Sequence, residues 1–231
     1  MAIEQHDIWA AGNGYEPYVG RWSRAVAREF LSWLALRAGA SWLDVGCGTG
    51  ALSRTILDNA APAHVIGIDP SEGFLVYARD RVRDARVEFR QGDDTKIPLD
   101  ASVVDAVVSG LVLNFVPDKE SAVREMARVA RPGAMVALYV LDYAGEMQLM
   151  RRFWDAAVAL DPAGAGPLDE GKRFPICAPE PLRSLFDDAG FGAIEVRDID
   201  VPTVFRDFDD FWTPFLGGQG PAPGYCMSLS E

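Results

Sequence analysis

The sequence is poor in cysteine and histidine. Its three cysteines, Cys47, Cys177 and Cys226, lie far apart and form neither a CxxC pair nor a Cys/His cluster with zinc spacing. This scarcity argues against a disulfide framework and a metal site, and a reducing, cytoplasmic setting fits best. The two histidines, His6 and His64, are the only histidine candidates for a general base.

Basic residues and long hydrophobic runs are also scarce. The chain has 22 Lys and Arg against 34 Asp and Glu, which gives a formal net charge of −12. Because such a surface repels polyphosphate, we expect no nucleic-acid partner. The sequence does not open with a basic stretch followed by an apolar one, and no apolar run approaches the length of a membrane span. We therefore expect a protein that is neither secreted nor membrane-embedded.

Short apolar segments alternate with amphipathic ones from residue 41 onward. The segments typical of buried strands are 41–45, 64–69, 86–91, 103–109 and 134–141. Helical periodicity covers 22–36, 71–84, 118–130 and the residues after Gly50. The tripeptide Arg131-Pro132-Gly133 is expected to separate the fourth helix from the fifth strand. This alternation predicts an α/β fold with a doubly wound, mostly parallel sheet that binds its ligand at the carboxyl ends of the strands.

The pattern changes beyond residue 141. We expect a helix over 145–160, followed by a stretch rich in Gly and Pro over 161–181 that we interpret as an inserted lid. A helix over 181–189 and a strand over 193–198 are predicted next. An aromatic-rich, loop-like tail ends the sequence.

A glycine-rich segment, Leu43-Asp44-Val45-Gly46-Cys47-Gly48-Thr49-Gly50, lies directly between the first strand and the helix that follows. Its glycines permit a sharp turn and let a ligand approach the main chain closely, although a tight turn without a ligand is the alternative. Asp69 ends the next strand, where a carboxylate can accept hydrogen bonds from both hydroxyls of a ribose. With Ser71, it can instead cap the following helix.

Two classes of nucleoside cofactor fit these features, the nicotinamide dinucleotides and S-adenosylmethionine. A pyrophosphate favours bare amides at a helix N-terminus and the spacing GxGxxG. Here the spacing is GxGxG, and Asp44 places a negative charge beside the turn, which suits an ammonium and a sulfonium better.

These motifs resemble those of the class I S-adenosylmethionine-dependent methyltransferases, in particular their ubiquinone/menaquinone-biosynthesis-like, small-molecule branch. The resemblance covers residues 15–141, and the matching motifs are 43–50, 66–70, 92–94 and 130–136. It implies methyl transfer from S-adenosylmethionine to a small-molecule acceptor. The cofactor-binding residues that it implies are Tyr18, Arg21, Asp44, Gly46, Cys47, Gly48, Gly50, Asp69, Pro70, Asp93, Asp94, Ser109 and Asn114.

The resemblance also implies a role for each of these groups. The glycines would pass the methionine portion, Asp44 would orient it, and Asp69 would hold the ribose. Asp93 and Asp94 would meet the adenine, although a solvated turn is the alternative. Ser109 and Asn114 would lie near the methionine ammonium and the acceptor pocket, although Asn114 can instead bond a loop backbone.

The N-terminal segment with Tyr15, Tyr18, Arg21 and Trp22 resembles the part of the family that covers the cofactor. Tyr18 or Arg21 would then reach the methionine carboxylate. The alternative is that the aromatic residues before a helix simply pack.

Aromatic side chains gather in the expected lid and tail, where they suit a flat or apolar acceptor or form a core of their own. They are Phe153, Trp154, Phe174, Phe205, Phe208, Phe211, Trp212 and Phe215. Trp212 and Phe215, beside glycines at 217–220, are the substrate-binding candidates. No catalytic base stands out, because His64 begins a strand and His6 lies near a terminus.

We expect a single domain, since neither an internal repeat nor a linker appears. Its expected parts are an N-terminal helical cap, a cofactor-binding core, the lid, and a C-terminal helix, strand and aromatic tail, over residues 1–40, 41–141, 142–180 and 181–231. The last antiparallel strand usual in the family is not apparent before residue 231. An unpaired sheet position favours self-association into a homo-oligomer, repair by another segment, or reduced stability.

Two functional alternatives stay open at this point. One is a nicotinamide-dependent oxidoreductase, which shares the sheet and the ribose-binding acid. The other is a non-catalytic nucleoside-binding module on the same fold.

Overall fold

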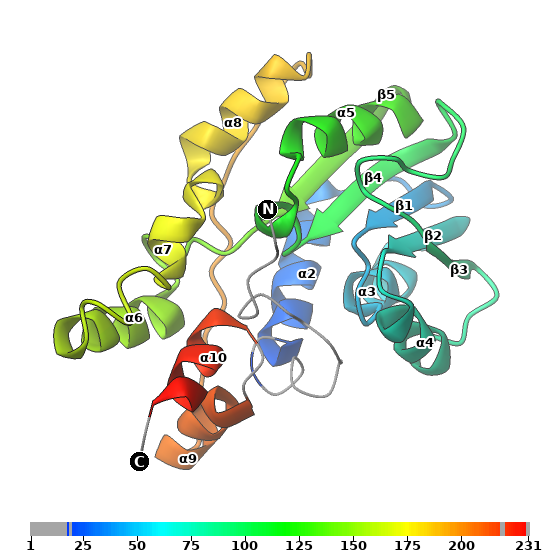
Figure 1. Cartoon of the computed structure of the whole chain (residues 1–231). Coiled ribbons are helices and arrows are strands. Elements are labelled where there is room, and N and C mark those ends of the chain that lie inside the picture. The colour runs from blue at the N-terminus through cyan, green and yellow to red at the C-terminus, as the bar shows by residue number, and fades with distance from the viewer. Residues whose placement is uncertain (1–17, 19, 218–219, 230–231) are drawn as a thin grey trace.

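A five-stranded parallel sheet forms the centre of the molecule (Figure 1). The structure is a computed structural model that describes residues 18, 20–217 and 220–229. In chain order the strands are β1 (Ser41–Val45), β2 (His64–Asp69), β3 (Val87–Gln91), β4 (Val104–Gly110) and β5 (Ala130–Tyr139). Their order in the sheet is β3-β2-β1-β4-β5, so the direction of winding reverses between β1 and β4. Ligands of such sheets bind beside that reversal, at the carboxyl ends of the strands.

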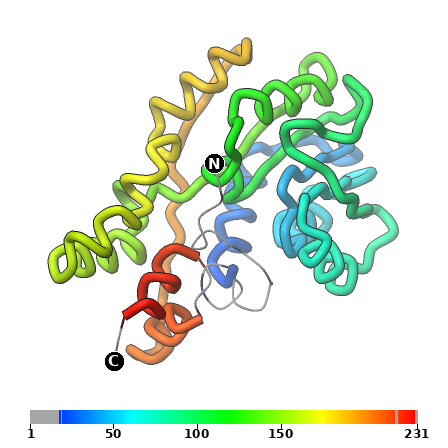
Figure 2. The backbone as a smooth tube through the Cα atoms, viewed as in Figure 1, coloured from blue at the N-terminus to red at the C-terminus, as the bar shows by residue number. Residues whose placement is uncertain are grey.

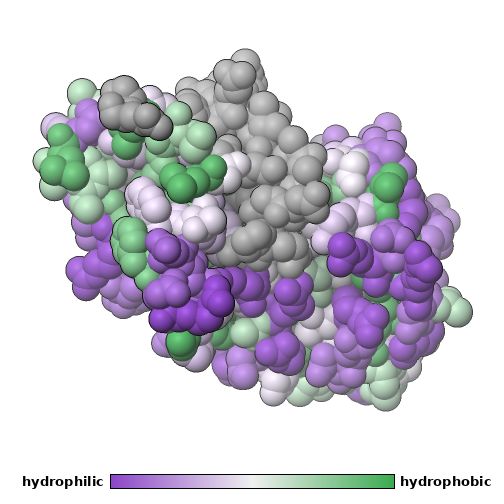
Figure 3. Space-filling view, turned by 90° about the horizontal axis from the view of Figure 1, so that it is seen from below, coloured by the Kyte–Doolittle hydropathy of each residue, from purple (hydrophilic) through white to green (hydrophobic). Residues whose placement is uncertain are grey.

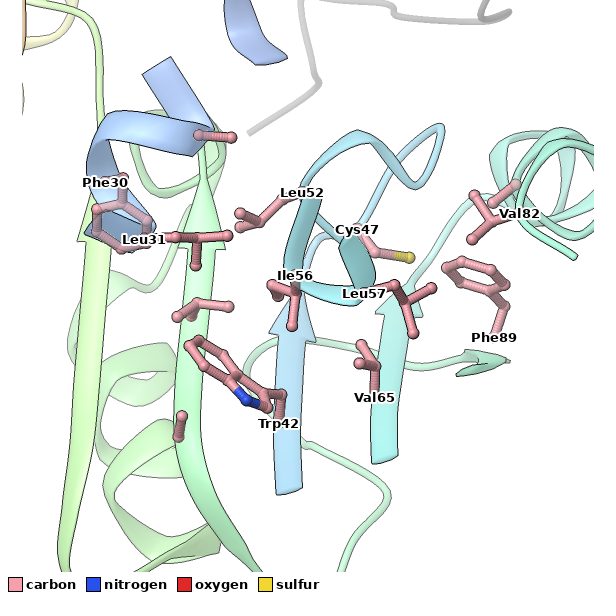
Figure 4. Packing of buried hydrophobic residues seen from close by; sticks show 14 of the residues in the cluster. Phe30, Leu31, Trp42, Cys47, Leu52, Ile56, Leu57, Val65, Val82 and Phe89 are labelled. Atoms are coloured by element: carbon pink, nitrogen blue, oxygen red, sulfur yellow. The ribbon is translucent and has the colours of Figure 1, made fainter. Parts of the chain in front are cut away.

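Helices cover both faces of the sheet, as the apolar strands require. They are α2 (Arg21–Leu34), α3 (Ala51–Asn59), α4 (Glu72–Arg81) and α5 (Lys119–Val129). On one face, Trp42 of β1 packs in a buried cluster with Phe30 of α2 and Ile56 of α3 (Figure 4). On the other face, Leu43 of β1 packs in a cluster with Met126 of α5. Neighbouring residues of one strand thus serve opposite cores, which confirms the prediction of a sheet buried on both sides.

The Arg131-Pro132-Gly133 tripeptide does not separate α5 from the fifth strand. It belongs to β5, which begins at Ala130, and the pairing of β4 with β5 shifts register between Val104 and Ala106. Gly133 has a φ of +79°, which glycine adopts without strain. We had expected Pro132 to require a separate turn. The irregular start of β5 instead accommodates this proline within the strand.

In the described residues after β5, the regular elements are helices and 3₁₀ turns separated by loops, and several of them pack around a second core (Figure 2). The longer helices of this C-terminal part are α6 (Gln148–Leu160), α8 (Pro179–Asp188) and α10 (Pro221–Ser228), and the shorter ones are α7 (Glu170–Arg173) and α9 (Phe208–Trp212). In the part of the chain that the structure describes, three 3₁₀ turns accompany the helices, η3 (Leu113–Phe115), η4 (Pro175–Cys177) and η5 (Thr213–Gly217).

Two predictions for this part were wrong. Residues 193–198 form no strand, and the tail holds helices instead of loops. Ile194 and Val196 are half-buried between exposed neighbours, so the period of two was present without a strand to pair with. The tail carried helix signals that we did not weigh, because Asp207 caps α9 and prolines open α10.

In Figure 3, hydrophilic side chains cover much of the coloured part of this face and hydrophobic ones gather toward one side. Among the described residues, no helix is both long and apolar enough to cross a membrane.

Candidate functional site

The glycine-rich loop leaves the carboxyl end of β1 and turns directly into α3. Gly46, Gly48 and Gly50 have φ values of +70°, +51° and +80°. Residues other than glycine rarely adopt positive φ, so the glycines fix the shape of the turn. The amide of Cys47 donates to the carbonyl of Ile68 at 2.9 Å, which ties the loop to β2. No atom lies within 4 Å of the place where Gly48 would carry a Cβ, so the main chain is open to a ligand there.

Asp69, at the end of β2, holds the loop in place. Its Oδ2 accepts a hydrogen bond from the amide of Gly48 at 2.9 Å, and its Oδ1 accepts one from the amide of Ser71 at 2.8 Å. Burial raises the pKa of this carboxyl, while the two amide bonds lower it. Ser71 in turn caps α4 by accepting from the amide of Phe74. The same carboxylate therefore organises the loop and the start of a helix, with Pro70 between Asp69 and Ser71 in the chain.

Asp44 of β1 is a fully buried carboxyl group with one satisfied oxygen. Its Oδ2 accepts from the hydroxyl of Ser53 at 2.7 Å, and its Oδ1 has no hydrogen-bond partner. Burial raises its pKa to about 7, opposed by the Ser53 bonds and assisted by the negative charge of Asp69. An unpaired buried carboxylate oxygen is costly unless a ligand supplies a cation or a donor. Sequence reasoning missed Ser53, whose only signal was its place on the first turn of the helix after Gly50.

The raised pKa of Asp44 gives a prediction for stability. Between about pH 4 and pH 7 the folded protein holds a proton on Asp44 that the unfolded chain has lost. Stability therefore falls as pH rises through this window, by at most about 1.4 kcal/mol per pH unit from this group. The measurement is urea unfolding from pH 4.5 to pH 8, with Asp44→Asn as the control in which this contribution disappears. Parallel pH profiles for the two proteins would contradict the burial of an ionisable Asp44.

The turn after β4 lies against the glycine loop. Val112 approaches Gly46 so closely that a Cβ on that glycine would lie 2.6 Å from both of its methyl groups. The Ser109 hydroxyl donates to the carbonyl of Val45 at 2.8 Å, which joins the ends of β4 and β1.

Leu111 turns the chain with a φ of +62°, and Asn114 on η3 is 95% buried, with no hydrogen-bond partner for its Nδ2. The Nδ2 of Asn114 is therefore not bonded to a loop backbone, and the alternative role of this residue rests on its amide oxygen alone.

The acidic pair after β3 lies beside Asp69. The amide of Gly92 donates to the carbonyl of Asp69 at 3.2 Å. Asp93 is exposed and accepts from the amide and the hydroxyl of Thr95, which lower its pKa. Burial and the neighbouring Asp93 raise the pKa of Asp94 to about 6.

The two N-terminal candidates contact the C-terminal elements. The Tyr18 hydroxyl donates to the sulfur of Met150 at 2.9 Å. The Arg21 guanidinium pairs with both carboxylate oxygens of Asp210, at 3.0 and 3.3 Å, and packs over the rings of Trp22 and Phe205. Tyr15 and His6 lie outside the described residues.

The candidate acceptor residues lie in the second core. Phe215 is buried and stacks on Trp212 and on Phe153. Trp212 is half-buried and also stacks on Phe208. His64 lies at the amino end of β2, away from the strand ends that carry the loop.

Comparisons with known proteins agree on one family. A family model described as a methyltransferase domain matches residues 43–138. The arsenite methyltransferase of Halobacterium salinarum is 31% identical over 179 residues, which cover 74% of this chain and 42% of that protein. A demethylmenaquinone methyltransferase of Listeria welshimeri is 34% identical over 114 residues, 48% of each chain. The chain thus spans about half the length of these curated relatives.

A solved structure supports the fold. A chain of a Haloferax volcanii complex that contains the Trm112 methyltransferase activator matches with a TM-score of 0.64 and 22% identity, over 88% of this chain and 85% of that one. The family match covers Asp44, the glycine loop, Asp69 at the end of β2 and the turn with Asn114. These findings support a class I S-adenosylmethionine-dependent methyltransferase.

Proposed function

We propose that this protein transfers a methyl group from S-adenosylmethionine to a small-molecule acceptor. The observation that carries the proposal is the glycine loop that Asp69 ties down at the carboxyl end of β1, beside the reversal of strand order. The family match supports a methyltransferase and gives no support to a nicotinamide-dependent oxidoreductase.

The residues at this edge fit the cofactor. Its amino acid end is charged, and the orphaned Oδ1 of Asp44 and Nδ2 of Asn114 are buried polar atoms that need such a ligand. The methionine portion would lie against the main chain of Gly46, Cys47, Gly48 and Gly50. Ser109 would border this part of the site. Asp69 keeps lone pairs beyond its two amide bonds and would accept from the ribose hydroxyls, with Pro70 alongside. Asp93 and Asp94 would hold the adenine.

The bound cofactor supplies an activated methyl group on a positively charged sulfur. The task of the protein is then to align the acceptor atom with that methyl carbon and to exclude water. The turn at Val112 and Asn114 would perform part of this exclusion, since Val112 packs on the glycine loop and Asn114 is buried. We assign no dedicated base, because a reaction of this kind depends mainly on alignment.

The names of the relatives favour small acceptors, since one acts on arsenite and the other on demethylmenaquinone. The aromatic core of the C-terminal part supports a flat or apolar acceptor for this chain. Trp212 and Phe215 remain our candidates for contact with it, with Trp212 the more exposed of the two. Tyr18 and Arg21 remain our candidates for contact with the methionine carboxylate, and they bond Met150 and Asp210 of the C-terminal part.

The test is calorimetric titration with S-adenosylmethionine, S-adenosylhomocysteine and NAD, followed by transfer of labelled methyl groups to a panel of phenols, thiols and amines. We expect binding of both sulfur compounds, no response to NAD, and label in at least one acceptor. Binding without any transfer would instead favour a nucleoside-binding module, and binding of NAD alone would refute the proposal.

A further inference from the structure

Exposed large hydrophobic side chains are concentrated near the end of the chain. Among the described residues eight such side chains are exposed, and five of them lie within residues 204–229. The elements that carry most of them pack together, because α10 contacts η5 and η5 follows α9 directly. In Figure 3 the hydrophobic side chains gather on the side where α9 and α10 lie in Figure 1. We call this surface the C-terminal patch, and its members are Val204, Phe208, Leu216, Met227 and Leu229.

The centre of the C-terminal patch is an aromatic ridge. Phe208, Trp212 and Leu216 follow one another at intervals of four residues along α9 and η5. Phe208 is 67% exposed and stacks on the half-buried Trp212, with ring centroids 5.9 Å apart and an angle of 14° between the planes. Trp212 stacks in turn on the buried Phe215 at 5.6 Å. The inner rings hold the outer ones in place, so a partner that binds the ridge has little side-chain entropy to remove.

The size of the patch suits a protein partner. A large apolar side chain that is at least half exposed presents on the order of 100 Å² to water, so the five members present roughly 500 Å². Single exposed hydrophobic residues are normal, but a patch of several hundred Å² indicates an association site. A standard interface takes about 800 Å² from each partner, including its polar rim.

The charges beside the ridge argue against a lipid surface. Residues 204–229 contain one basic residue, Arg206, and three acidic ones, Asp207, Asp209 and Asp210. Asp210 pairs with Arg21 and with Arg206, whereas Asp207 and Asp209 lie exposed at the amino end of α9. Amphipathic helices that bind lipid carry Lys and Arg beside their apolar face. The C-terminal patch has the opposite charge pattern.

A second copy of the chain fits both the apolar surface and its charges. A two-fold axis pairs a patch with itself, so no second complementary surface is required. When two ridges pack antiparallel, Asp207 and Asp209 of one copy lie toward the Leu216 end of the other. The acidic ends of the two ridges are then at opposite ends of the contact and do not repel each other.

We infer that the C-terminal patch is the interface between two copies of this chain, with Phe208 and Trp212 at its centre. This helical surface is distinct from the unpaired sheet position for which the sequence predicted self-association. Pairing of this kind is independent of the proposed function. Because Trp212 and Phe215 are also the candidate acceptor residues, the second copy covers the outer side of that part of the molecule.

The test is sedimentation velocity of the full chain at concentrations from about 1 to about 100 µM. We expect a dimer for the wild type. Phe208→Glu and Met227→Glu each place an unpaired charge in the contact, twice per dimer, and should raise the dimer Kd about a hundredfold or more. Val76→Glu is the matched control, because it makes the same kind of change at a side chain of α4 that is 59% exposed and outside the patch. This variant should stay dimeric.

Three results would overturn the inference. The first is a wild type that stays monomeric at the highest concentration, and the second is a dimer that neither patch variant weakens. The third is equal weakening by Val76→Glu, since the added negative charge would then be responsible. Circular dichroism checks folding, and Met227→Glu decides the question if Phe208→Glu does not fold. Co-sedimentation with phosphatidylcholine and phosphatidylglycerol vesicles adds a direct comparison, because vesicle binding that Phe208→Glu abolishes in a monomeric protein would assign the patch to a lipid surface instead.

Discussion

Asp69→Ala is expected to weaken binding of S-adenosylhomocysteine roughly a hundredfold, about 3 kcal/mol, because it removes a charged acceptor from the ribose and from the loop together. The amide of Gly48 loses its carboxylate partner, so the loop that presents the main chain loses its anchor to the end of β2. The adjacent amide of Ser71 also loses its acceptor. Calorimetric titration of the folded variant measures the effect.

Ser71→Ala is the matched control for this experiment. It removes the hydroxyl that caps α4 and leaves the backbone amide of residue 71 on Asp69. We expect a loss of about 1 kcal/mol in stability with nearly unchanged affinity. If Asp69→Ala affects affinity no more than Ser71→Ala does, the carboxylate serves the helix and the loop alone, and its assignment to the ribose is wrong.

The core of the fold was predictable because its signals are local. β1 and β2 have the predicted ends, and β3 and β4 differ by one residue at each changed end. Continuous apolar runs between helices leave few alternatives to a covered parallel sheet. The glycine loop was equally predictable. Glycine is the residue that adopts a positive φ without strain, and the three glycines of this loop are its three positions with positive φ.

The unpredicted features depend on tertiary contacts. The partner of Asp44 is a serine nine residues away, and the partner of Arg21 is an aspartate 189 residues away. Residues 193–198 have the alternation of a strand, but a strand forms only where it can pair with the backbone of a neighbouring strand. The lack of any partner for Asn114 Nδ2 is likewise a property of the packed turn, and sequence reasoning left two roles for it open.

The second core makes a prediction about stability. Trp154 of α6 is fully buried, and its Nε1 donates to the buried carboxylate of Glu170 at 3.0 Å. Its ring packs edge-on against Phe153 and tilted against Tyr225 of α10. Trp154→Ala should lower the free energy of unfolding by about 3–5 kcal/mol, since it opens a large cavity. The lost indole donor adds to this cost.

Two further variants of the same helix show whether the cavity or the donor dominates. Trp154→Phe keeps most of the volume without the N–H, so we expect an intermediate loss of about 1–3 kcal/mol. Leu160→Ala changes a side chain that is 87% exposed and should stay within about 0.5 kcal/mol of wild type. Urea unfolding followed by circular dichroism provides the comparison. If Trp154→Ala costs no more than Leu160→Ala, then α6 and α10 do not share a packed core in solution, and the aromatic side chains around them are free to line an acceptor site instead.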